Sequence, residues 1–337
     1  MLLKHLFAAT LLTAATLGGF IACDTSSKQV TPEAPADTLH VPAFNADTAF
    51  AYIEAQCALG YRVPGTEVHR KAATYIADAF RMLGLAVEEQ NTMLTTYNGV
   101  TFPATNIIAR YRPEATQRIL LGAHWDTRPW ADNDPDAANH RHPVMGANDG
   151  ASGVAVMLEI ARQLVATQPN IGIDFVAFDG EDHGVAQWDT YNDYNGSSWC
   201  LGSQYWAAQA RQAGYRPTFG ILLDMVGGQG AKFYREGFSM QYASGIVDLV
   251  WSAAERAGYG SYFPKQDGGM ITDDHVPVNR IAGIPMIDII PFFPDHPQGT
   301  FGPTWHTIYD TPENIDRATL KAVGQTVLQV IFEQAAS

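Results

Sequence analysis

The sequence has 337 residues, of which 46% are hydrophobic, enough to fill the core of one large α/β domain or two small ones. Its 21 basic residues are outnumbered by 35 acidic residues, which gives a formal net charge of −14. A surface this acidic repels nucleic acids and anionic membrane surfaces, so we exclude both as partners and consider peptides with free amino termini instead.

The N-terminal segment is typical of an exported bacterial protein. Lys4 precedes an apolar run that ends in the letters FIAC at Cys23, which resembles a lipobox. The run is short for a transmembrane anchor, the alternative, and two glycines interrupt it. We therefore predict that residues 1–22 are a cleaved signal peptide, that Cys23 is lipidated, that residues 23–40 are a flexible tether, and that residues 41–337 form the functional domain. The mature protein would be periplasmic or tethered to a membrane only through this lipid.

Two further cysteines, Cys57 and Cys200, have no metal-binding spacing. In an exported protein they could form a disulfide, and in a domain this large they could equally be buried free thiols.

The first predicted elements are helices. Apolar spacing indicates a helix over 47–59 with Asp47 as its N-cap, and a second that is capped by Thr66 and ends at Gly84. Continuous apolar runs, typical of strands buried on both faces, then alternate with helical patterns. The strands are predicted over 106–111, 119–123, 171–178, 220–226 and 285–290, and the helices over 153–166, 204–213, 245–257 and 318–335. This alternation predicts a single-domain α/β/α sandwich with a central, mostly parallel mixed sheet.

In such a sheet the ligand site lies beyond the carboxyl ends of the strands. His124 and Asp126 follow the run 119–123, and the period of two puts them on one side of an extended segment, where the carboxylate could orient the imidazole. Asp149 lies in a glycine-rich turn before a helix. It is either part of an ordinary helix start or a metal ligand.

The following strand ends carry more acids. After the run 171–178, Glu181 and Asp182 are adjacent on a loop and point in different directions, so Asp182 can bind a metal while Glu181 faces the substrate as a proton carrier. Asp224 directly follows another apolar run and is costly to bury without a cation or a shared proton. The segments Asp273-Asp274-His275 and Trp305-His306-Thr307 add further ligand types. Histidine and carboxylate without thiolate suit a catalytic zinc ion with an open position.

The segments HWDTRP, GANDGASG, DGED, LLDMVG, ITDDHVP and WHT occur together in this order. With them the sequence resembles the zinc aminopeptidase superfamily and, within it, the animal-type glutaminyl cyclases, from about Tyr61 to the last helix. The resemblance implies one Zn²⁺ held by Asp149, Asp182 and His306, Glu181 as proton shuttle, and Asp224 and Asp273 as a hydrogen-bonded carboxylate network. Asp182 departs from the Glu of the animal enzymes, and Thr272 from a Gln.

The resemblance also implies aromatic walls around the substrate side chain, formed by Trp188, Phe301 and Trp305. For Trp188, in a loop rich in Asn, Asp and Gly, ordinary packing is an open alternative. The loop that contains Asp132, Asp134 and Asp136 is expected to be solvated rather than to bind calcium.

The activity implied is a glutaminyl-peptide cyclotransferase, which converts the N-terminal glutamine of peptides or proteins to pyroglutamate and releases ammonia. The alternative is a zinc-dependent aminopeptidase, in which a second zinc ion would be held with the help of His124 and Asp224, while Asp126 stands behind His124. A second alternative is a non-catalytic binding domain, which loss of the metal ligands would mark; none of these ligands is missing.

Overall fold

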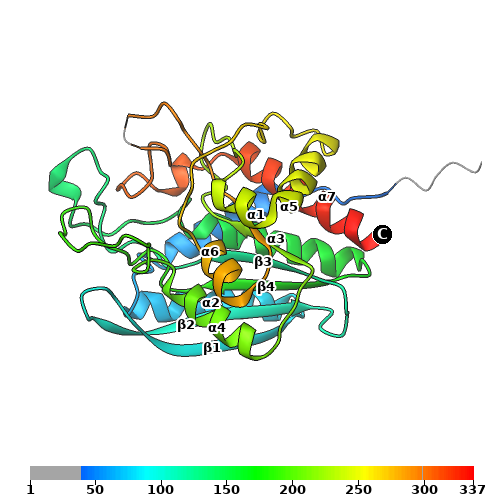
Figure 1. Ribbon diagram of the computed structural model, residues 1–337, viewed down its shortest axis with the longest axis horizontal. Helices are drawn as coiled ribbons and strands as arrows, with labels where there is room; N and C mark the ends of the chain where they lie inside the picture. The colour runs from blue at the N-terminus through cyan, green and yellow to red at the C-terminus, as the bar shows by residue number, and fades with distance from the viewer. Residues whose placement is uncertain (1–38, 298) are drawn as a thin grey trace, which may run out of the picture. The chain divides into compact units, whose positions relative to one another are not determined.

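The computed structural model describes residues 39–297 and 299–337 of the chain (Figure 1). The predicted signal peptide, Cys23 and most of the predicted tether lie outside these residues. Within them, no helix is both long and apolar enough to cross a membrane. Cys57 and Cys200 are both buried and free, so these two cysteines do not form a disulfide.

A six-stranded sheet lies at the centre of the domain, in the order β1-β2-β4-β3-β5-β6 (Figure 1). The strands are β1 (Ala86–Thr95), β2 (Thr101–Tyr111), β3 (Arg118–His124), β4 (Gly172–Phe178), β5 (Phe219–Leu223) and β6 (Met286–Ile289). Strands β3 to β6 pair in parallel, whereas β2 pairs antiparallel with both β1 and β4. The sheet is therefore mixed and mostly parallel, which confirms the predicted fold class.

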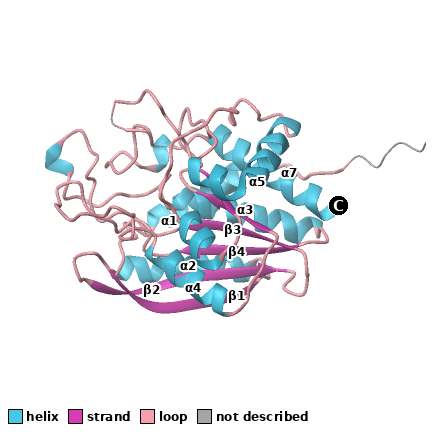
Figure 2. Ribbon diagram, in the orientation of Figure 1, coloured by secondary structure: helices cyan, strands magenta, loops and turns pink. Residues whose placement is uncertain are grey.

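Helices cover both faces of this sheet (Figure 2). The larger core joins one face to α1 (Ala46–Ala58), α2 (Glu67–Met82), α3 (Ala151–Thr167), α5 (Gly237–Arg256) and α7 (Arg317–Ala336). The smaller core joins the other face to α4 (Leu201–Gln212) and η2 (Val278–Ala282), with α6 (His275–Pro277) just before η2. Two further short turns are η1 (Ala137–Asn139) and η3 (Pro312–Asn314).

The strands alternate between these two cores, which is why their sequences are apolar throughout. Along β3, Ile119 and Leu121 belong to the larger core, and Leu120 belongs to the smaller core together with Trp206 of α4. Because the sheet is buried on both faces, a ligand can reach it only at the ends of the strands.

Some element boundaries differ from the prediction. The N-cap of α1 is Asn45, whose side chain accepts hydrogen bonds from the backbone of Asp47 and Thr48, so Asp47 is not the cap. Thr66 does cap α2, where it accepts from the backbone N–H of His69. Strand β1 was not predicted, because this edge strand is largely solvated and has no continuous apolar run.

Candidate active site

Polar side chains follow β3, β4 and β5 at the carboxyl ends of these strands, as expected for neighbouring parallel strands. This end of the sheet is called the site edge. His124 is the last residue of β3, Asp179 directly follows β4, and Asp224 directly follows β5. All three are buried, and so are Asp126 and Asp182 on the loops that follow β3 and β4. Buried ionisable groups gathered at one edge of a sheet mark a functional site rather than a solvated surface.

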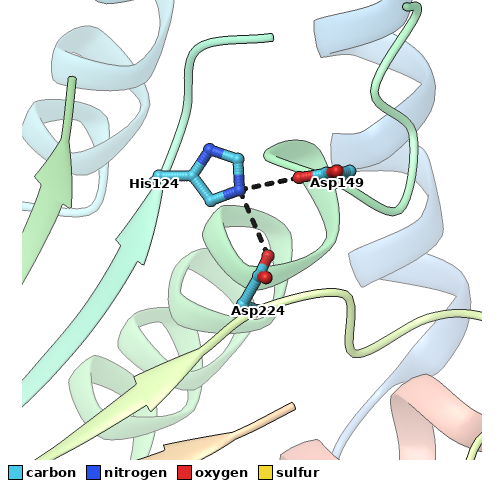
Figure 3. A group of neighbouring side chains, drawn as sticks. All are labelled: His124, Asp149 and Asp224. Atoms are coloured by element: carbon cyan, nitrogen blue, oxygen red, sulfur yellow. Dashed lines mark hydrogen bonds and ion pairs between the residues drawn. The ribbon is translucent and has the colours of Figure 1, made fainter. Parts of the chain in front are cut away.

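Asp149 lies between two histidines at this edge. Its Oδ1 is 2.9 Å from His124 Nε2, which is also 3.1 Å from Asp224 Oδ1 (Figure 3). Its Oδ2 is 3.6 Å from Nε2 of His306, and that nitrogen is 3.0 Å from Asp182 Oδ1. The structure thus brings together two possible ligand sets that share Asp149, namely Asp149, Asp182 and His306, and His124, Asp149 and Asp224.

The first of these sets fits a metal ion. Both carboxylate oxygens of Asp182 and Oδ2 of Asp149 are buried, and no donor among the described residues hydrogen-bonds to them. A buried carboxylate without a donor is costly unless a cation compensates its charge. His306 Nε2 lies near these oxygens without hydrogen-bond geometry, as expected if all of them are directed at a common ion. Two carboxylates and one imidazole make a set with an open position, as in catalytic zinc sites.

Neighbouring carboxylates hold residues of both ligand sets in place. Asp310 accepts from the backbone N–H groups of Asn148, at 2.7 Å, and Asp149, at 2.9 Å. Asp126 Oδ1 is 3.6 Å from His124 Nδ1, the orienting contact that the period of two predicted. Supports of this kind behind metal ligands hold their orientation.

Asp132 is the corresponding support for His306, and the prediction of a solvated loop was wrong for it. It is 1% exposed, and its Oδ1 lies 3.4 Å from His306 Nδ1. The buried Arg128 binds both of its oxygens, at 2.8 and 2.6 Å, and also donates to the carbonyl of Asp182. Asp134 is buried too and accepts from the backbone N–H of Ile308. These two buried acids stabilise the loops around the site through their hydrogen bonds.

Glu181 is buried beside this set and lines the main cavity. Burial raises the pKa of its carboxyl well above the usual value, and the negative charges of Asp182 and Asp273 add to this effect. Cys200 lies next to Glu181, with its Sγ 3.4 Å from Glu181 Oε1. A carboxylate with a raised pKa at the wall of a cavity is suited to take up and return a proton.

The carboxylate network around Asp273 is larger than predicted. Burial raises the pKa of Asp224 to about 7, and the negative charge of Asp273 adds to this effect. Asp288, a fully buried residue of β6 that the sequence analysis did not single out, lies close to Asp273 and His275. Neither oxygen of Asp288 has a hydrogen-bond partner among the described residues, and burial together with the charges of Asp273 and Asp224 raises the pKa of Asp288 well above its usual value. These surroundings favour the protonated form of Asp288.

The cavity over this edge has a volume of about 850 Å³. Phe301 and Trp305 line it with ring centroids 4.7 Å apart, and Trp305 stacks on His306 at 3.8 Å. Trp199, which the sequence analysis missed, also lines it, as does Thr272. Trp188 does not line it: this ring packs against Trp130 and lies under the guanidinium of Arg141. The position of Trp188 therefore supports the packing alternative rather than a pocket wall.

Comparison with known proteins gives one consistent family. Residues 106–331 match the model of peptidase family M28. A glutaminyl cyclase structure from Tannerella forsythia is 52% identical with a TM-score of 0.83, over 86% of this chain and 99% of that one. A structure from Bacteroides thetaiotaomicron, described as a leucine aminopeptidase precursor, is 49% identical with a TM-score of 0.83, over 88% of this chain and 99% of that one. Among curated proteins, glutaminyl-peptide cyclotransferase from Bos taurus is 26% identical over 300 residues, 80% of this chain and 77% of the bovine protein. The chain therefore belongs to peptidase family M28 and, within that family, to the glutaminyl cyclases.

Proposed function

We propose that this protein is a glutaminyl-peptide cyclotransferase that converts the N-terminal glutamine of peptides or proteins to pyroglutamate and releases ammonia. One observation carries the proposal. Glu181, a buried carboxylate whose pKa is raised by burial, lies at the wall of a cavity that also contains the Asp149, Asp182 and His306 set and the Phe301 and Trp305 rings. The similarity to the Tannerella forsythia cyclase supports it.

We infer that Asp149, Asp182 and His306 hold one zinc ion. Asp182 is shorter than the Glu of the animal enzymes, yet its Oδ1 still comes within 3.0 Å of His306 Nε2. When bound, the ion would supply Lewis-acid polarisation of the amide under attack. The electron-rich oxygens of Asp149 and Asp182 that lack donors are the structural reason for placing a cation there.

The chemistry needs one proton carrier. The α-amine of the substrate attacks the carbon of its own γ-carboxamide, so that a new C–N bond closes a five-membered lactam and the original C–N bond breaks. Glu181 takes the proton that the amine loses and returns it to the leaving nitrogen, which departs as ammonia. Glu181 ends the cycle as it began. The Phe301 and Trp305 rings hold the side chain and exclude water from the carbon under attack.

An aminopeptidase is the second candidate, and a specific observation favours it. His124, Asp149 and Asp224 form a second possible metal set that shares Asp149 with the first. Paired metal ions that share a ligand suit hydrolysis by an activated water. The Bacteroides thetaiotaomicron structure described as a leucine aminopeptidase precursor is as similar in fold as the cyclase.

Mass spectrometry of two matched peptides separates these functions. One peptide begins with Gln, the other begins with Leu, and each is incubated with zinc-loaded protein. Loss of ammonia from the first, with the second intact, establishes the cyclase. Release of free Leu identifies an aminopeptidase instead, and two unchanged peptides contradict both.

We also propose that the protein is exported and tethered to a membrane by a lipid on Cys23. The basis is the sequence of residues 1–23. Cys23→Ala is expected to move the protein from the membrane fraction to the soluble fraction when cells of the native or a related host are separated by centrifugation. Ser26→Ala, three residues further along, should stay with the membrane. Wild-type protein in the soluble fraction would contradict the tether.

A further inference from the structure

The cavity carries a single permanent positive charge among the described residues that line it. This charge belongs to Arg280, an exposed residue of η2. The other side chains of the lining that can carry a charge near neutral pH are His306 and a series of acids: Asp149, Glu181, Asp182, Asp193, Asp224 and Asp273. A chain with a net charge of −14 and an acidic cavity attracts the α-amino end of a peptide and repels a carboxylate. Arg280 has the opposite charge and can attract a carboxylate.

Neighbouring side chains hold Arg280 in place without neutralising it. Its Cζ lies 4.9 Å from the ring centroid of Phe238, which also lines the cavity. Its Nε donates to the hydroxyl of Tyr242 at 2.8 Å. In the part of the chain that the structure describes, no carboxylate pairs with this guanidinium, in contrast to Arg118 and Arg128, each of which binds both oxygens of an aspartate. The two terminal nitrogens of Arg280 remain available to a ligand in the cavity.

A guanidinium that is held over an aromatic ring is well prepared to bind a carboxylate. The contact with Phe238 and the hydrogen bond to Tyr242 hold the group in place, and its two terminal nitrogens have no partner among the described residues. An arginine edge and a carboxylate match as two parallel hydrogen bonds. Because Arg280 is already oriented, little side-chain entropy is lost when it binds.

The shared cavity indicates which part of a peptide reaches Arg280. Arg280, Asp273 and Glu181 all line this cavity. An extended peptide covers about 3.3–3.6 Å per residue, so a peptide whose N-terminal glutamine lies at Glu181 can bring one of its next few residues to Arg280. A cavity of about 850 Å³ has room for a peptide of this length.

We propose that Arg280 is a specificity-determining residue that binds a peptide carboxylate beyond the N-terminal glutamine. The carboxylate is either the acidic side chain of a nearby residue, tested here at the third position, or the free C-terminus of a short peptide, tested here with a tripeptide. This inference rests on the proposed cyclase function. It predicts that the enzyme prefers short or acidic glutamine peptides, against the repulsion exerted by the rest of its charge.

The test compares kcat/KM for two matched pairs of substrates. One pair is Gln-Ala-Glu-amide and Gln-Ala-Gln-amide, and the other is Gln-Ala-Ala with a free carboxylate and with a C-terminal amide. In the wild type we expect at least one carboxylate peptide to exceed its neutral partner by about 3- to 10-fold, and the ratio to fall in high salt. In Arg280→Met the ratio should drop to one or below, and Arg280→Lys should keep part of it.

Arg216→Met is the matched control. Arg216 is exposed, lies just before β5 at the opposite edge of the sheet, and does not line the cavity. Its loss removes one positive charge from the protein and should leave the wild-type ratio unchanged. A preference confined to the first pair identifies the acidic side chain as the ligand, and one confined to the second pair identifies the C-terminus.

Two results would overturn the inference while the cyclase function stands. One is efficient cyclisation of all four peptides with ratios near one in the wild type. The other is a carboxylate preference that persists in Arg280→Met. If the wild type cyclises none of the four peptides, the proposed function fails, and the inference fails with it.

Discussion

Glu181 and Asp182 are neighbours in the sequence, yet the structure gives them separate surroundings. Asp126 accepts hydrogen bonds from both of their backbone N–H groups, at 3.0 Å for Glu181 and 3.2 Å for Asp182. This fixes the loop, so that Asp182 meets His306 while Glu181 meets Cys200. One carboxylate is thus placed to bind a metal and its neighbour to carry a proton.

Replacing Glu181 by Gln tests the proton carrier. The amide is close to the carboxylate in shape but has no basic oxygen, so we expect kcat for cyclisation to fall by about 100-fold or more. Zinc content and thermal stability, measured in parallel, should stay near the wild type. Glu255→Gln, an exposed position on α5, is the control. Near-normal turnover in a folded, zinc-loaded Glu181→Gln protein would contradict the role.

Cys200 is expected to position Glu181. Burial raises the pKa of this thiol well above its usual value, so it stays protonated and can donate to Glu181 Oε1. We expect Cys200→Ala to lower kcat by roughly 3- to 10-fold with little change in KM, because one modest hydrogen bond to the base is lost. Cys200→Ser, which retains a donor, should recover most of the loss. Equal kcat values for the Ala and Ser variants would show that only packing is at stake there, and Cys57→Ala serves as the control for a buried cysteine elsewhere.

The sequence indicated most residues at this edge because they directly follow apolar runs. It missed Asp288 because this acid lies inside such a run, although a lone acid in a buried strand is itself a signal of a special environment. It misjudged Asp132 because alternating acids in a polar loop are usual on solvated surfaces. The buried partner, Arg128, is four residues away but becomes a partner only through the fold of the loop.

At the scale of elements, continuous apolar runs predicted the buried strands well. Strand β1 escaped because its side chains are mostly solvated, and its position is set by its pairing with β2 rather than by its own composition. Helix α5 begins at Gly237, eight residues before the predicted start at 245, but its backbone is not helical at Ala243 (φ −149°, ψ 41°), so the predicted helix corresponds to the part after this kink. The part before the kink was missed because its N-cap, Glu236, is not of a residue type preferred at helix starts.

Glu236 joins the start of α5 to the loop that carries the site. Its carboxylate accepts from the backbone N–H groups of Phe238 and Ser239 on the helix, from Ile271 on the loop, and from His275 Nε2 at 3.0 Å. Burial alone would raise the pKa of Glu236, but the hydrogen bond and charge of His275, with the backbone donors, lower it to about 2. The carboxylate of Glu236 therefore links the start of α5 to the segment that contains Ile271 and His275.

This pairing predicts a pH-dependent contribution to stability. Because the pKa in the folded protein is about 2 and the usual value is 4.5, the contribution is complete above about pH 4.5 and is lost as the pH falls toward 2. Its upper limit is about 3 kcal/mol. Urea unfolding should show Glu236→Gln less stable than the wild type at pH 7, with the difference shrinking between pH 5 and 3. Glu54→Gln, on the exposed side of α1, should show no such trend. A difference independent of pH would contradict the linkage.

The whole molecule combines a net charge of −14 with a cluster of buried acids at one edge of its sheet. Like charges gathered in a low-dielectric interior destabilise the folded state unless cations or shared protons compensate them. Arg128 compensates Asp132, and burial favours the protonated, uncharged form of Asp288. Three of the four carboxylate oxygens of Asp149 and Asp182 have no hydrogen-bond donor among the described residues, and Arg128 Nη1 lies 3.6 Å from Asp182 Oδ1, beyond hydrogen-bond distance.

Removal of metal should therefore lower the stability of the entire domain. A ligand at 100 times its Kd adds about 2.7 kcal/mol to the free energy of unfolding, which corresponds to a Tm shift of roughly 4 °C for a domain of this size. We expect treatment with a chelator to lower Tm by this amount and stoichiometric zinc to restore it. In Asp182→Asn both treatments should have little effect, because a ligand is lost while the buried charge is removed. A wild-type Tm that is the same with and without zinc would show that the uncompensated acids of this edge are stabilised by some other means, and would remove the main structural support for a zinc ion at Asp149, Asp182 and His306.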